Sequence, residues 1–305
     1  MIKRPLVALF IALATITAWA DPAGTIFLIQ RMLPQEGFYP ALELEASPGR
    51  IAEWGWEMDQ KIKAAPFAVK EVNKYAATLP TAEGDIMREY ASWIFNNVPN
   101  ELDSTLRQTI NDWNKTIQAA FKVSGKPKGN KDLRKRLDRA WEALAARTAV
   151  DVGRMGKESE EANQFRQQLA TLEGKWAGKD EPIHKKYAMP ANDEDNAAYS
   201  ELASQAISLS SLSDKLRLPV VQNGENQYEG AIFQQPNFYP LAWREMEAMA
   251  LENSDEGEYV RVVILRNYSQ PPPGGVSGQW QIHRSWRLGE VDIPTASELS
   301  EEKAE

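Results

Sequence analysis

Residues 99–123, PNELDSTLRQTINDWNKTIQAAFKV, carry the clearest helical period in the chain. Asn100 is a good N-cap, and Glu101 and Asp103 suit the positive end of the helix dipole. The apolar residues recur every three or four positions and therefore share one face. We predict an amphipathic helix whose apolar stripe lies in a core: Leu102, Leu106, Ile110, Trp113, Ile117 and Phe121.

Segments with the same period flank this stretch on both sides. Upstream, we expect one helix to end near Pro66, a second to end at Pro80 and a third to follow from Thr81, because proline interrupts a helix interior. Downstream, helical patterns surround Trp141 and Phe165. Helices joined by short links pack as a bundle, so we assign residues 49–216 to a helical bundle.

The C-terminal region, residues 217–293, has the character of an α+β unit with a β-hairpin. Residues 259–268 form the strongest predicted strand, and residues 279–288 are its expected partner. Residues 218–221 and 227–234 are two shorter predicted strands, separated by an Asn223-Gly224 turn. Residues 236–251 are predicted as one more helix. One face of the 279–288 strand should carry Trp280, Ile282, Trp286 and Leu288.

The predicted fold class is therefore α+β, mainly an α-helical bundle with a small antiparallel β-sheet in the C-terminal third. Residues 21–48 are expected to be an extended segment, in which the β-branched and aromatic run 25–29 favours a strand that joins the C-terminal sheet. Residues 294–305 are expected to be an acidic, disordered tail.

Residues 1–20 have the layout of a cleavable secretory signal peptide. Lys3 and Arg4 precede an uncharged apolar run, and Ala18-Trp19-Ala20 places small residues at the two positions that a signal peptidase reads. The apolar run is shorter than the roughly 20 residues of a membrane span. We therefore expect cleavage after Ala20, release into the periplasm and no transmembrane segment after signal removal.

The composition limits the chemistry. The formal net charge of −8 disfavours nucleic acid as a partner, and the absence of Cys excludes thiolate chemistry. The two histidines, His184 and His283, have no second ligand at metal-binding spacing. We therefore expect neither a metal site nor a cofactor, and no catalytic residue is assigned.

Two stretches are candidate binding surfaces. Residues 115–139 hold nine Lys or Arg residues against two Asp residues, which is typical of a docking patch or of a solvated loop that acids elsewhere balance. A stiff proline-rich loop, residues 269–275, has aromatic residues at its base. The candidate binding residues are Lys126, Lys128, Lys131, Arg134, Lys135, Arg136, Tyr268 and Trp280.

These observations favour an exported periplasmic interaction protein without catalytic activity. A protein partner with an acidic surface is expected, and peripheral contact with the envelope remains open. Such a protein serves a cell-envelope, secretion or conjugation assembly, or neutralises a toxin as an immunity protein. The alternative is a peptidoglycan hydrolase with a Glu general acid, for which Glu53 and Glu57 beside Trp54 and Trp56 are the candidates.

Overall fold

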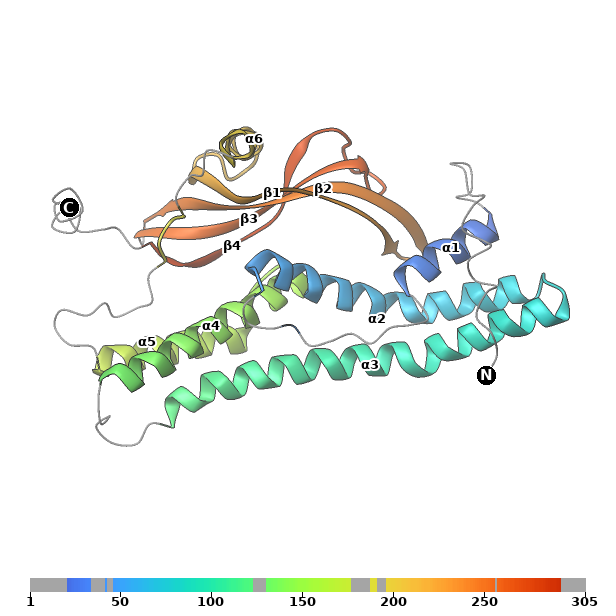
Figure 1. Ribbon diagram of the computed structural model, residues 1–305, viewed down its shortest axis with the longest axis horizontal. Coiled ribbons are helices and arrows are strands. Elements are labelled where there is room, and N and C mark those ends of the chain that lie inside the picture. The colour runs from blue at the N-terminus through green and yellow to red at the C-terminus, as the bar shows by residue number, and fades with distance from the viewer. Residues whose placement is uncertain are drawn as a thin grey trace.

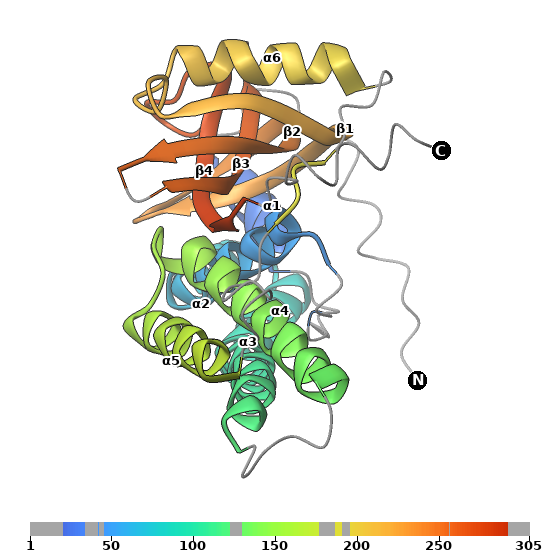
Figure 2. The same ribbon diagram turned by 90° about the vertical axis from the view of Figure 1, so that its left-hand side faces the viewer.

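The computed structural model describes residues 21–33, 42, 46–122, 130–176, 187–190, 196–255 and 257–291. These residues form three layers: a layer of long helices, a four-stranded antiparallel sheet that arches over it, and one helix on the outer face of the sheet (Figures 1 and 2). The predicted α+β class is confirmed. The signal peptide and the acidic tail predicted from the sequence lie outside the described residues.

Four helices make the helical layer: α2 (Pro48–Ala76), α3 (Thr81–Phe121), α4 (Asn130–Met155) and α5 (Glu160–Trp176). The predicted helix end near Pro66 and the predicted helix start at Asn100 are wrong, because Pro66 and Pro99 lie inside continuous helices. An interior proline removes one backbone hydrogen bond. Burial of the flanking residues Ala65, Ala68 and Val98 holds the helices together across these points.

Helix α1 (Pro22–Met32) replaces the predicted N-terminal strand. The Asp21 carboxylate accepts a hydrogen bond from the backbone N–H of Ala23, and Pro22 occupies the first helical turn. Both features favour a helix start. The β-branched residues Ile26 and Ile29 lie on the buried face of this helix, in the core. Helix α1 packs against α2 and against the first two strands of the sheet.

The sheet consists of β1 (Leu216–Gln234), β2 (Asn237–Ser254), β3 (Gly257–Gln270) and β4 (Trp280–Glu290), hydrogen-bonded in that order. The predicted pairing of β3 with β4 is confirmed. The predicted turn at Asn223-Gly224 is wrong, because β1 continues through it with three register shifts against β2. The helix predicted over residues 236–251 is also wrong, because that segment is β2, which is paired on both sides.

Alternate residues of β2 point to opposite layers. Glu247 and Met249 face the helical layer, whereas Met246, Ala248 and Ala250 belong to a core shared with α6 (Ala197–Ser208). Helix α6 therefore covers the outer face of the sheet and does not extend the bundle as predicted (Figure 2).

Strand β4 changes face at a bulge. Ile264 pairs with Arg284 and Leu265 pairs with Ile282, which leaves His283 as the extra residue. Trp286 and Leu288 therefore pack toward the helical layer, whereas Trp280 and Ile282 pack toward α6. The prediction of one apolar face for these four residues is wrong, since period-two counting does not anticipate a bulge.

Helices α2 and α4 cross at very short distance. A Cβ on Gly153 would lie 1.9 Å from the carbonyl oxygen of Ala52, and a Cβ on Gly55 would lie 2.9 Å from that of Val150. Glycine is therefore required at the crossing. This contact fixes the first turns of α2, which face the sheet. None of the described helices is long and apolar enough to span a membrane.

Candidate functional site

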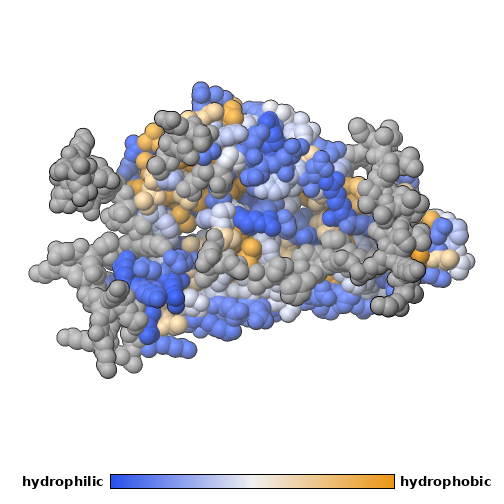
Figure 3. Space-filling view, in the orientation of Figure 1, coloured by the Kyte–Doolittle hydropathy of each residue, from blue (hydrophilic) through white to orange (hydrophobic). Residues whose placement is uncertain are grey.

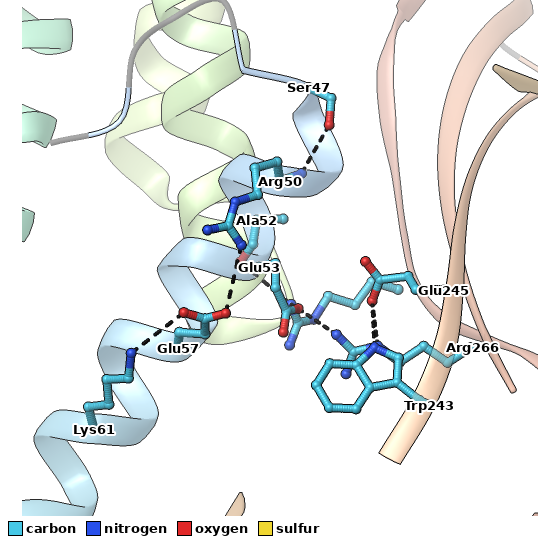
Figure 4. Close-up of polar contacts among 10 residues, drawn as sticks. Ser47, Arg50, Ala52, Glu53, Glu57, Lys61, Trp243, Glu245 and Arg266 are labelled. Carbon is cyan, nitrogen blue, oxygen red and sulfur yellow. Dashed lines mark hydrogen bonds and ion pairs between the residues drawn. The ribbon is translucent and has the colours of Figure 1, made fainter. Parts of the chain in front are cut away.

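A cavity of about 280 Å³ lies between α1, the first half of α2 and the strands β1 and β2. Its wall is polar and aromatic. The side chains that the following argument uses are Arg31, Ser47, Arg50, Glu53, Glu57, Gln60, Lys61, Tyr228, Glu229, Trp243, Glu245 and Glu247. Figure 4 shows that Glu53 of α2 points toward Arg266 and Glu245 of the sheet.

A fully buried arginine forms the floor of the site. Arg266 on β3 is 0% exposed, and its guanidinium lies 2.7 Å from Glu53 and 2.6 Å from Glu245 (Figure 4). Arg284 on β4 lies 3.3 Å from the same oxygen of Glu53. Burial alone would lower the pKa of Arg266, but Glu53 and Glu245 outweigh it and raise that pKa. Arg266 therefore stays charged and ties β3 to α2 and β2.

Aromatic rings enclose this ion cluster. The guanidinium carbon of Arg266 lies 4.5 Å from the Trp243 ring centroid and 5.7 Å from that of Trp56. Arg284 lies 5.3 Å from the Trp56 ring. A cation over an indole face is stabilised by the ring quadrupole, most strongly where water is excluded. Two of the ten tryptophans thus serve to bury charge.

Glu247 is held at the start of α2. The Ser47 hydroxyl donates a 2.8 Å hydrogen bond to its Oε2, and the backbone N–H of Gly49 donates another. A Cβ on Gly49 would lie 2.4 Å from this oxygen, so glycine permits the approach. Burial raises the pKa of Glu247, the two hydrogen bonds oppose that rise, and the charge of Glu245 adds to it.

The rim of the cavity consists of ion pairs. Arg31 on α1 lies 2.8 Å from Glu229 on β1, and Glu57 lies 3.8 Å from Arg50 and 3.6 Å from Lys61. Glu57 and its two cations all belong to α2 (Figure 4). These pairs satisfy the basic side chains of the wall within the protein.

His283 is buried near Arg266 and Arg284, at the bulge in β4. Burial lowers the pKa of His283 well below its usual value, and the nearby charges of Arg266 and Arg284 lower it further. The imidazole is therefore neutral at pH 7. Within the described part of the chain, no group of three or more His, Asp or Glu residues has an arrangement that could hold a metal ion.

The predicted basic patch is only partly described. Lys126 and Lys128 lie outside the described residues, and Lys131 belongs to α4 although its side chain is not described. Arg134 pairs with Asp138 at 3.3 Å and with the buried Glu173 of α5 at 3.5 Å. Lys135, Arg136 and Arg139 are exposed on α4. Among the coloured residues of Figure 3, hydrophilic ones line the lower part of the molecule, where the long helices run.

The structure does not bring Tyr268 and Trp280 together as one contact surface. Tyr268 is 6% exposed and packs with Trp243 and Leu241, on the side of the cavity. Trp280 packs on the opposite side of the sheet, and the guanidinium of Arg244 lies 5.6 Å from its ring. The bulge at His283 places the Trp280 side chain on that opposite face.

The central residues of the site, Arg266, Arg284, Glu245 and Glu247, were not among the predicted ones. One signal was available in the sequence. Arg266 ends the apolar run 262–265 and shares its alternation with Val262 and Ile264, so its side chain points into the core. A buried charge requires a partner of opposite sign. Comparison of the chain with protein families, curated proteins and solved structures finds no match.

Proposed function

We propose that this chain is an exported periplasmic interaction protein that acts by contact with a protein partner. The supporting observation is the basic stripe, defined by Lys135 and Arg139 on one face of α4. Both residues are exposed, and no ion pair joins either of them to another residue in the described ranges. Arg134 anchors this part of α4 to α5 through Glu173. A fixed cationic surface of this kind complements an acidic protein surface.

The cellular setting of the proposal follows from the leader-like residues 1–20. In the periplasm, the protein serves a cell-envelope, secretion or conjugation assembly, or neutralises an incoming toxin. N-terminal sequencing of the protein recovered from the periplasmic fraction should give Asp21 as the first residue. A chain that begins at Met1 and stays in the cytosol would exclude all of these settings.

Charge reversal tests the basic stripe. The double variant Lys135→Glu, Arg139→Glu should lose most of the partner that the mature protein captures from periplasmic extract, because like charges then face each other. The matched control Lys70→Glu, Lys157→Glu makes the same change at two exposed lysines elsewhere and should capture the partner normally. Equal capture by both variants would refute a role for the stripe.

A second candidate function, cell-wall hydrolysis, is favoured by Glu247. A general acid needs a raised pKa, and burial raises that of Glu247. Glu53 and Glu57 suit the role less well, because each is ion-paired with two cationic side chains. Peptidoglycan incubated with the purified mature protein should then release soluble fragments, and Glu247→Gln should abolish the release. Absence of release by the wild-type protein would rule this function out.

A further inference from the structure

The cavity between α2 and the sheet has unused hydrogen-bond acceptors. Glu53 Oε1 and Gln60 Oε1 are buried and receive no hydrogen bond from any described residue. The other oxygen of Glu53 is the one that Arg266 and Arg284 share. A buried acceptor without a donor is unfavourable, so a ligand that brings N–H or O–H donors to these oxygens binds favourably.

The charges of the cavity wall favour a cationic ligand. Arg31, Arg50 and Lys61 are each ion-paired with a carboxylate of the same wall. Glu247 is different, since it receives donors only from Ser47 and Gly49, and no cation lies against it in the described part of the chain. The raised pKa of Glu247 reflects the cost of its buried negative charge. A positive group beside it would offset that cost.

The acceptors follow the axis of α2. Glu247 of β2 lies beside residues 47–49, at the start of α2. Glu53 and Gln60 follow along the same wall of the cavity. Seven residues of helix separate Glu53 from Gln60, which corresponds to about 10 Å along the axis. A compact ligand with one donor group does not reach both of these positions, whereas a linear molecule with several donors does.

The opposite wall of the cavity is aromatic. Tyr228 is 38% exposed, and its ring stacks on Trp243 with centroids 5.4 Å apart. Aromatic faces attract cations and also pack against alkyl chains. The same site already holds the guanidinium of Arg266 against Trp243. The wall opposite α2 therefore suits a chain of methylene groups that carries positive charges.

We propose that this cavity binds a linear aliphatic polyamine. One ammonium group pairs with the carboxylate of Glu247, and the N–H donors farther along the chain reach Glu53 Oε1 and Gln60 Oε1. The cavity volume of about 280 Å³ accommodates a small molecule of this shape. This inference is independent of the proposed protein partner, which docks on α4.

Calorimetric titration of the full mature protein tests the proposal, with spermidine as the probe and octanediol as a neutral linear counterpart. Spermidine should bind and raise the melting temperature, more weakly at high salt, whereas octanediol should do neither. Glu247→Gln should weaken spermidine binding by about tenfold or more, because a charge-assisted hydrogen bond is lost. The control Glu201→Gln, at an exposed residue of α6, should leave the affinity unchanged.

A second variant guards against a folding defect in Glu247→Gln. Gln60→Leu removes one acceptor without changing charge and should weaken spermidine binding by roughly two- to tenfold. The proposal is overturned if octanediol binds as well as spermidine, if neither variant changes the affinity, or if the cavity takes a saccharide such as N-acetylglucosamine instead. Reversal of Lys135 and Arg139 should leave spermidine binding intact, which separates this test from that of the protein partner.

Discussion

Under α6 the sheet presents an apolar cluster, whereas beside the cavity it meets α2 through an ion cluster. On the α6 side, Met246, Ala248, Val263 and Leu265 are almost fully buried in one hydrophobic cluster. On the α2 side, near the cavity, the same strands bury Arg266 and hold Glu245 in an ion cluster with Glu53. The ion cluster belongs to the region of the cavity, since elsewhere on the same face Val262 and Ile264 pack in the main hydrophobic core with the helices.

This difference indicates where the structure departs from what stability alone requires. Apolar packing needs only shape, whereas a buried ion cluster bears a desolvation cost that well-packed hydrophobic residues would avoid. The apolar clusters on the two sides of the sheet are therefore sufficient to explain folding. The ion cluster of Arg266, Glu53 and Glu245 is a structure that stability alone does not require, and it borders the cavity.

The largest effect is expected at the centre of the polar face. Arg266→Ala leaves Glu53 and Glu245 buried without their main cation and should lower the free energy of unfolding by about 3–5 kcal/mol. Urea unfolding measures this loss. The control Arg88→Ala breaks a surface pair with Asp85 and should cost less than about 1 kcal/mol. Similar losses for the two variants would contradict the contrast between the faces.

A smaller effect is expected on the apolar face. Val263 is 0% exposed in the cluster under α6. Val263→Ala removes two methyl groups and leaves a small cavity, so the free energy of unfolding should fall by about 2 kcal/mol. Since no charge is involved, the loss should be the same at low and high salt. A salt-dependent loss would mean that charged residues contribute to the energetics of this cluster.

Two glutamates on opposite faces of β2 should give the smallest effects. The pH dependence of their contributions to stability should have opposite signs. Burial tends to raise the pKa of Glu252, but hydrogen bonds from Arg261 and Arg287 outweigh it and lower that pKa. The stabilisation from ionised Glu252 is therefore present above its ordinary value of 4.5 and is lost as the pH falls through the folded-state pKa. Glu252→Gln should destabilise the protein by about 1 kcal/mol near pH 7, and less in acid.

Glu247 has a raised pKa, so its proton binds more tightly in the folded state than in the unfolded state. The wild-type protein should therefore lose stability relative to Glu247→Gln as the pH rises from 4.5 through the folded-state pKa. Urea unfolding of the wild type and of both variants between about pH 4 and pH 7 gives the pH dependence of each stability difference. If the stability difference between wild type and variant changes with pH in the same direction for Glu252→Gln and Glu247→Gln, the opposite pKa shifts of the two glutamates are contradicted.

The sequence predicted those elements in which local pattern and tertiary environment agree. The stripe from Leu102 to Ile117 and the alternation in β3 are of this kind. Strand β2 was mistaken for a helix because Leu, Met, Ala and Glu are good helix formers. Pairing with β1 and β3 on both sides overrides that preference, which is a tertiary effect. The Asp21-Pro22 start of α1 was a local signal that the β-branched run obscured.

The candidate site was less accessible to prediction than the fold. A cluster of like charges such as residues 115–139 is visible in a linear sequence, but the cavity joins residues far apart along the chain. Glu53 and Arg266 are more than 200 positions apart, and the bulge at His283 decides which side Arg284 faces. Glu53 was considered as an acid for catalysis, whereas its two arginine partners emerge only from the packing of α2 on the sheet.

The unusual length of β1 has a consequence for the behaviour of the protein in solution. A long, regular outermost strand exposes a row of free backbone groups that can recruit another chain and start aggregation. In β1, the three register shifts between Arg217 and Asn226 interrupt that row, and Leu218 has a φ of 50°. Charged residues such as Glu225 and Glu229 follow along the same strand. The register shifts in β1, where a hairpin turn was predicted, therefore also disfavour the addition of a strand from another molecule.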